Sequence, residues 1–224
     1  MKPLCLLLGL VGFIIACSPL PKVLPVDGSA LPELYQECRR PFPEGKWQLL
    51  HSIEATLPGG AKGWVMGVTI ISSPGRTAHC VIMTIEGLVV LDAQYDRQLV
   101  VNRGVPPFDT DDFAEGLIKD IQLIFFPPEG PLTQAGIFKN GSSVCRHQNP
   151  DGQIVDVIAR NDKGWELRQY GKDLRLSRTV RAFFDKNGGD SAQLGIPARL
   201  ELTAHGSPGY ALTMDLLEAV PLKP

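Results

Sequence analysis

Histidine and cysteine side chains are the residues of this chain best suited to hold a metal, and their spacing is not typical of a metal site. The histidines are far apart, and none lies at metal-ligand spacing from another: His51, His79, His147 and His205. Cys145-Arg146-His147 and His79-Cys80 come nearest to a zinc site, but they lack a recognised ligand spacing. We therefore expect no metal and no cofactor.

Acidic residues cluster at Asp109, Asp111 and Asp112, just before a predicted helix. Carboxylates at a helix start are explained by capping and by the helix dipole, so the cluster does not by itself indicate catalysis. The sequence contains no G-x-S-x-G elbow and no glycine-rich phosphate loop. We therefore expect a binding or transport protein and not an enzyme. An envelope hydrolase would need a polar constellation inside a cavity, and the sequence indicates none.

Cys17 has the strongest chemical context in the chain. Lys2 is followed by an apolar run, residues 4–15, which is shorter than the roughly 20 residues of a membrane span and is typical of a secretory signal. The run ends in Ile14-Ile15-Ala16-Cys17, which resembles a lipobox. The sequence thus predicts a signal peptide over 1–16 and lipidation of Cys17. The alternative is an ordinary signal peptide that ends in Cys by chance.

A lipid on Cys17 would anchor the protein to a membrane. Ser18 follows the cysteine, where an Asp would favour retention in the inner membrane. We therefore expect the periplasmic face of the outer membrane. Three further cysteines, Cys38, Cys80 and Cys145, would enter an oxidising compartment. One disulfide and one thiol, in any pairing, or three buried thiols fit this count.

The composition is that of a well-cored protein with many turns, with 44% hydrophobic residues, 23 Gly and 19 Pro. The net charge is −2, and the absence of any basic run argues against nucleic acid as a partner.

We divide the chain into the signal peptide, a proline-bearing lipidated tether with a short helix over 17–44, and one β domain over 45–224. The short helix is expected near residues 32–39. Eleven strands are predicted from short apolar stretches between turn signals. They lie near 47–57, 63–72, 77–86, 88–95, 98–103, 142–148, 153–160, 165–171, 174–185, 196–205 and 209–219. A Gly/Pro-rich loop is expected over 129–141.

The late strands alternate between apolar and polar residues, whereas the early strands are apolar on both faces. The second apolar face must be covered by a helix or by a ligand. Residues 111–124 are expected to form that helix, beginning with a capping box of Asp112 and Glu115. Phe113, Leu117, Ile121 and Ile124 form its apolar stripe, with Ile118 beside it. The pattern thus predicts a mainly β protein whose strongly curved sheet is plugged by a helix.

The run from Leu117 to Pro127 (LIKDIQLIFFP), the lipobox, the segment 87–91 and the closing hairpin over 196–217 carry a family resemblance. Together they resemble an uncharacterised family of bacterial lipoproteins similar to the outer-membrane lipoprotein receptor of the Lol pathway, often found beside aryl-polyene-type lipid biosynthesis clusters. The resemblance implies a half-open barrel of eleven antiparallel strands with helices plugging an apolar concavity. It also implies that acyl chains are accepted from a soluble periplasmic carrier protein. In that receptor an apolar residue projects between the third and fourth strands, and Leu88 stands at the corresponding junction here, in a shorter turn.

We therefore expect a lipid or acylated ligand to bind or to be transferred in an apolar cavity. The residues expected to line it are Trp64, Met66, Val68, Met83 and Leu88 from the early strands, with Phe113, Leu117 and Ile121 from the helix. One alternative is that these residues only fill a core. Another is an assembly lipoprotein that holds a protein partner at the sheet edge or at the 127–141 loop.

Overall fold

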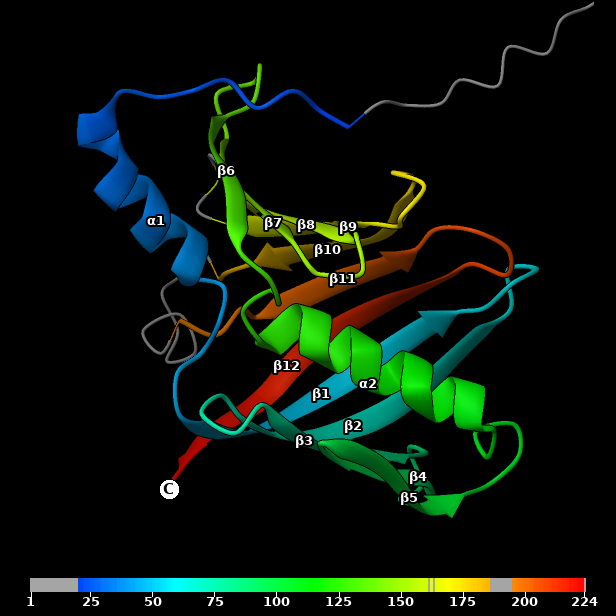
Figure 1. The fold of residues 1–224 in the computed structure, drawn as a ribbon. Helices are drawn as coiled ribbons and strands as arrows, with labels where there is room; N and C mark the ends of the chain where they lie inside the picture. The colour runs from blue at the N-terminus through cyan, green and yellow to red at the C-terminus, as the bar shows by residue number, and fades with distance from the viewer. Residues whose placement is uncertain (1–19, 161, 163, 186–194, 224) are drawn as a thin grey trace, which may run out of the picture.

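A single antiparallel sheet dominates the computed structural model, which describes residues 20–160, 162, 164–185 and 195–223 (Figure 1). Its twelve strands run in the order β5-β4-β3-β2-β1-β12-β11-β10-β9-β8-β7-β6, so the sheet is open, with β5 and β6 at its two edges. The strands are β1 Lys46–Thr56, β2 Lys62–Ser72, β3 Thr77–Met83, β4 Val89–Asp96, β5 Gln98–Gly104, β6 Leu132–Ile137, β7 Ser143–Gln148, β8 Ile154–Ala159, β9 Trp165–Tyr170, β10 Leu176–Phe183, β11 Arg199–Ala204 and β12 Tyr210–Leu222.

The predicted mainly β fold is confirmed, and each of the eleven predicted strands corresponds to one strand of the sheet. The additional strand, β6, lies inside the predicted loop 129–141. It is short, and its first three residues are exposed, so its sequence carries little strand signal. It pairs with the next strand, β7, on one side and with the distant Leu24 on the other.

The sheet has two faces, which we call inner and outer. On the inner face, residues paired across β1, β2 and β3 are buried in one core, for example Leu49, Thr69 and Cys80. On the outer face, the alternate residues point away from that core because successive side chains of a strand point to opposite sides. Trp64, which is 53% exposed, is one of these.

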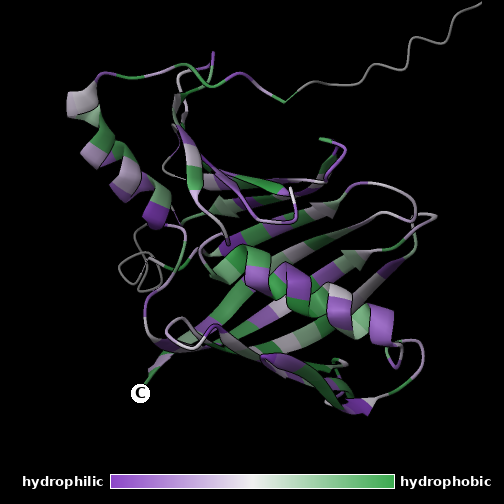
Figure 2. Cartoon of the chain, in the orientation of Figure 1, coloured by the Kyte–Doolittle hydropathy of each residue, from purple (hydrophilic) through white to green (hydrophobic). Residues whose placement is uncertain are grey.

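Helix α2, Asp111–Phe125, lies across the inner face (Figure 1). Apolar and polar residues alternate along it (Figure 2), and its buried residues include Ile118, Ile121 and Ile124. The expected capping box is wrong: the N-cap is Thr110, whose hydroxyl accepts a hydrogen bond from the Phe113 amide. Thr110 is the last extended residue before the helix, so its side chain reaches the free amide first.

Helix α1, Leu31–Arg39, carries a proline in its first turn, as expected, and packs against β6, β7 and β8. A disulfide joins its Cys38 to Cys145 of β7, with a sequence separation of 107. Cys80 is the remaining thiol in the described chain, and burial raises its pKa to about 11. Sequence spacing left this pairing open, because only the tertiary fold brings α1 onto β7. None of the described helices is long and apolar enough to cross a membrane.

Residues 20–27, which we call the strap, are bound to the sheet. Leu24 and Ile137 exchange two backbone hydrogen bonds of 2.8 and 2.9 Å at the free edge of β6. The close approach requires glycine at position 136, where a Cβ atom would lie 2.0 Å from the Leu24 carbonyl oxygen. The segment expected to be a tether is therefore attached to the domain well before α1. Residues 1–16 and Cys17 lie outside the described residues.

Candidate ligand-binding site

The interface between α2 and the inner face is an apolar surface that would be exposed if the helix moved away from the sheet. From α2, Ile118, Ile121 and Phe125 are each at most 6% exposed. They share one core with inner residues of β1 to β4, among them Leu49 and Leu91. Ligand binding at this interface would require α2 to move, because these side chains fill the space beneath it.

The helix residues predicted to line a cavity all face this interface. Ile121 is buried, and Phe113 and Leu117 are partly buried against the same core. Phe113 also packs edge-on against Phe108, with ring centroids 5.2 Å apart, at the N-terminal end of α2. The structure therefore brings this predicted group together.

The strand residues predicted to line the same cavity lie on the outer face. Met66 pairs with Ser52 and Met83, and Val68 pairs with Leu50, whereas the intervening Gly67 is on the inner face. Trp64, Met66, Val68 and Met83 are absent from the core that contains α2. The expectation that both groups line one cavity is corrected: the sheet separates them.

Small residues recur on the inner face, and a glycine within a strand often marks the close approach of another group. At Gly67 an added Cβ atom would come within 2.8 Å of the Ile53 side chain. Ala78 and Ala93 are buried on the same face. This series of small inner residues is the sequence signal that could have identified the helix-covered face.

Leu88 lies in the turn between β3 and β4 and is 53% exposed, and Ile85 in the same turn is 72% exposed. Gly87 has a φ of 88°, and its amide donates to the Thr84 carbonyl, which closes a tight turn. The turn is short, as expected, but it presents two apolar side chains to solvent.

A buried polar cluster joins α2 to the sheet. Asp120 of α2 accepts hydrogen bonds from the Arg178 Nε of β10, at 2.5 Å, and from the Tyr210 hydroxyl of β12. Burial raises the pKa of the Asp120 carboxyl, although Arg178 and Tyr210 oppose this shift. Burial and the Asp120 charge also raise the pKa of Tyr210. We call this group the latch, because it connects the helix to both strands by polar contacts alone.

Sequence reasoning did not find the latch. Its residues come from three distant segments, and Asp120 sits within an otherwise amphipathic helix, where an acid is usually a solvated side chain. The one local signal is its spacing: Asp120 lies within one turn of Leu117, Ile121 and Ile124, on the side that faces the sheet.

Two further polar groups are buried in the inner core. His51 lies beneath α2, with its ring centroid 6.4 Å from that of Phe125, and burial lowers its pKa to about 4 although Asp215 opposes the shift. Trp165 of β9 is 4% exposed, and its indole N–H has no hydrogen-bond acceptor among the described residues. An unpaired buried donor costs about 1–3 kcal/mol.

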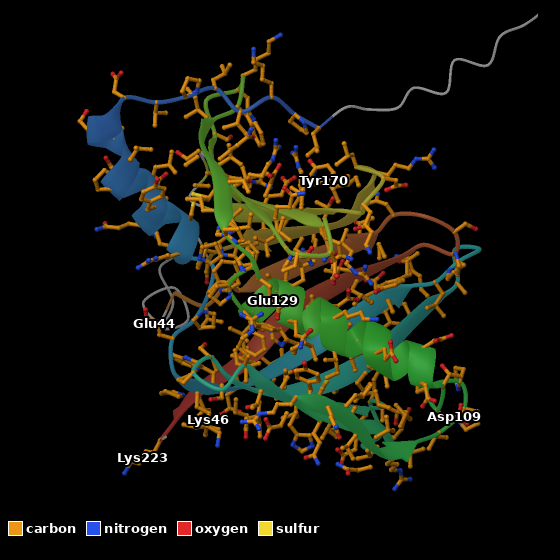
Figure 3. All side chains as sticks on the ribbon, in the orientation of Figure 1. Glu44, Lys46, Asp109, Glu129, Tyr170 and Lys223 are labelled. Atoms are coloured by element: carbon orange, nitrogen blue, oxygen red, sulfur yellow. A yellow bond between two sulfur atoms is a disulfide. The ribbon has the colours of Figure 1, made fainter. Side chains whose placement is uncertain are left out.

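A cleft of about 320 Å³ opens at the C-terminal end of α2. Arg76, Lys119 and Arg178 contribute cations to its wall, and Leu123 and Phe126 contribute apolar surface. Arg178 thus belongs both to the latch and to the cleft. Glu129, which Figure 3 labels beside this end of α2, pairs with Arg76 at 3.4 Å.

The described residues form no group of three His, Cys, Asp or Glu side chains that could hold a metal ion. Cys145 is bonded to Cys38, and so it is not a free ligand beside His147. His79 points to the outer face, where it lies 2.8 Å from Asp92, whereas its neighbour Cys80 points inward. In neither of the two sequence pairs that came nearest to a zinc site are the Cys and His side chains therefore available together as metal ligands.

The fold is similar to that of a LolA superfamily protein from Nitrosomonas europaea, with a TM-score of 0.56 and 14% sequence identity over 87% of this chain and 94% of that chain. A DUF1329 family protein from Desulfovibrio piger covers the same shares of the two chains, with 12% identity and a TM-score of 0.48. The sequence matches no family model and no curated protein. At 14% identity, the first similarity shows the fold.

Proposed function

We propose that this protein is a lipid-anchored envelope protein that binds or transfers an acylated ligand between α2 and the inner face of the sheet. The observation that carries the proposal is the construction of the interface. A separate helix covers an apolar sheet face, and a polar latch joins the two. A helix held in this way can move outward as a unit, and an acyl chain can replace its buried contacts at about 25 cal/mol per Å² of apolar surface.

The polar groups around the interface suit a ligand with one polar end. The indole N–H of Trp165, which has no acceptor in the described part of the chain, can donate to a carbonyl oxygen of the ligand. The cleft beside Arg178 has space and cations for a polar headgroup. The name of the similar Nitrosomonas structure places it in the LolA superfamily, which agrees with a role in lipid handling. An aryl-polyene-type lipid, the class associated with the family resemblance, is one ligand that we propose to test.

The anchor and location are further parts of the proposal. Lipid on Cys17 would hold the protein at the periplasmic face of the outer membrane, where a soluble periplasmic carrier would deliver the ligand. The proposed role requires no catalytic step.

Site-specific photocross-linking tests where the ligand binds. A photoreactive side chain at Leu117, beneath α2, is expected to capture lipid from the protein's own envelope, detected as a mass increase of the purified adduct. The matched control is the same side chain at Val68, which is also partly buried but lies on the outer face. Lipid capture at Val68 and not at Leu117, or at neither position, contradicts the proposal.

A second candidate function is an assembly lipoprotein that holds a protein partner. The observation that favours it is the exposure of Trp64, Ile85 and Leu88, which places apolar surface on and beside the outer face. Stoichiometric cross-linking of the Val68 variant to a protein, with no lipid bound at Leu117, would favour this candidate.

A further inference from the structure

The strap fixes the start of the described chain to the sheet through side chains as well as backbone. Arg146 of β7 donates to the Pro21 carbonyl at 3.0 Å. The same guanidinium binds both oxygens of Asp156, which is fully buried, at 2.7 and 2.8 Å. Val23 packs on an outer-face cluster of Phe138, Val144 and Ile158. From Pro21 onward the chain is therefore attached to the β domain.

The distance from the strap to the predicted lipid is short. Pro21 is the fourth residue after Cys17. Four residues span at most about 14 Å when fully extended. A lipid on Cys17 therefore holds Pro21 within about 14 Å of the membrane surface, whatever path the intervening residues take.

The outer face beside the strap is basic. An open pocket of about 500 Å³ borders Phe138 and Ile158, the side chains on which Val23 packs. Three arginines line this pocket with two carboxylates, and the exposed Lys22 and Lys139 flank it in the sequence. The pocket's charged residues are Arg160, Asp162, Glu166, Arg168 and Arg181. Arg160 pairs with Asp162, whereas Arg168 and Arg181 both pair with Glu166, so these five residues carry one net positive charge. Lys22 and Lys139, next in sequence to Val23 and Phe138, add two more, in a chain whose net charge is −2.

We infer that this basic outer surface beside the strap rests on the anchoring bilayer and binds the anionic headgroups of its phospholipids. The inference rests on the lipid anchor of the proposed function, but not on ligand binding beneath α2. The short reach from Cys17 brings the surface to the membrane, and opposite charge orients it. The inner face and α2 then point away from this bilayer, open to a carrier. In Figure 1 the strap and α2 lie on opposite sides of strands β7 to β10.

The orientation can be measured on the mature lipidated protein in nanodiscs that contain phosphatidylglycerol and a lipid with a nitroxide headgroup. A fluorophore is attached through Asn140→Cys, beside the basic surface, or through Glu86→Cys, in the β3–β4 turn. Both positions are exposed, and native Cys80 is buried. We expect strong quenching at 140 and weak quenching at 86. Stronger or equal quenching at 86 overturns the inference.

Charge reversal tests the headgroup contact. Lys22→Glu with Lys139→Glu should lower the ratio of docked to undocked protein by about tenfold or more, since each lysine near an anionic surface adds to the attraction. Quenching at 140 should fall accordingly, and phosphatidylcholine nanodiscs should give the same loss. Lys46→Glu with Lys223→Glu makes the same charge change at the opposite end of the molecule (Figure 3) and should leave quenching unchanged. Equal loss in both double variants overturns the headgroup contact.

Mass spectrometry of the purified protein separates this inference from the proposal on which it rests. An unlipidated N-terminus would remove the anchor and with it the inference. A lipidated protein that fails only the Leu117 cross-linking test would leave the orientation standing.

Discussion

At the scale of single residues, the inner core contains polar groups that an ordinary sheet core would exclude. His51 is 4% exposed, yet it lies beneath α2 beside Phe125. A buried imidazole that must stay neutral makes the protein sensitive to acid, because protonation places a charge in the core. Because His51 lies against α2, this sensitivity to acid affects the helix that we propose to move.

His51 should therefore make stability depend on pH. Its folded pKa of about 4 lies below the usual 6.5 of an unfolded histidine, so the unfolded state binds a proton first as the pH falls. Stability is complete above the unfolded pKa and is lost between about pH 6.5 and 4. Between pH 7.5 and 5 the loss from this residue should be about 2 kcal/mol.

Urea unfolding of wild type and His51→Leu at these two pH values measures the effect. The variant should lose less stability than wild type by about that 2 kcal/mol, because leucine does not titrate. An equal loss in both proteins would show that His51 is not the sensitive group.

At the scale of elements, α2 is joined to the sheet by apolar contacts, which a ligand can replace, and by the latch. Asp120 is the only latch residue on the helix. Breaking a buried pair by removing one partner usually costs about 3–5 kcal/mol. The latch therefore sets how readily α2 leaves the inner face.

Asp120→Asn should lower the free energy of unfolding by about 3 kcal/mol and speed amide hydrogen exchange in α2 more than in β1. Glu115→Gln is the matched control, because Glu115 is an exposed acid of the same helix, paired with Lys119 at 3.0 Å. Such a surface pair contributes less than about 0.5 kcal/mol. Comparable effects of the two variants would contradict the role of the latch in holding α2 on the sheet. A fluorescent fatty acid should also bind faster to Asp120→Asn.

At the scale of the whole molecule, the N-terminal segment crosses the β6 edge and contacts both faces of the sheet. Val23 packs on the outer face, whereas Val26 and α1 pack on the core of the inner face. The Cys38–Cys145 disulfide holds this arrangement. It closes a long loop, and such cross-links stabilise mainly by restricting the unfolded chain.

Cys38→Ala with Cys145→Ala should destabilise the domain by about 3–4 kcal/mol and remove its response to reductant. Thermal unfolding with and without dithiothreitol measures both effects. Cys80→Ala is the control: it should remain sensitive to reductant, because it leaves the disulfide intact. A double variant as stable as wild type would mean that the strap and the core hold α1 without the disulfide.

The sequence by itself determined the features that local patterns encode. Alternation and turn residues predicted eleven strands, and the helical spacing of Phe113, Leu117 and Ile121 predicted α2 and the side that it buries. Both depend on interactions within a few residues. They could therefore be predicted without a tertiary structure.

Only the tertiary structure decided which strand face the helix covers, which cysteines pair and what the latch contains. Strands β2 and β3 are apolar on both faces, so alternation could not say whether Met66 or Gly67 points inward. The larger side chains were the natural choice for a cavity, but they point to the outer face, and Gly67 lies on the inner face. Cys38 with Cys145, and Asp120 with Arg178, meet across more than fifty residues of chain, a separation at which no local pattern operates.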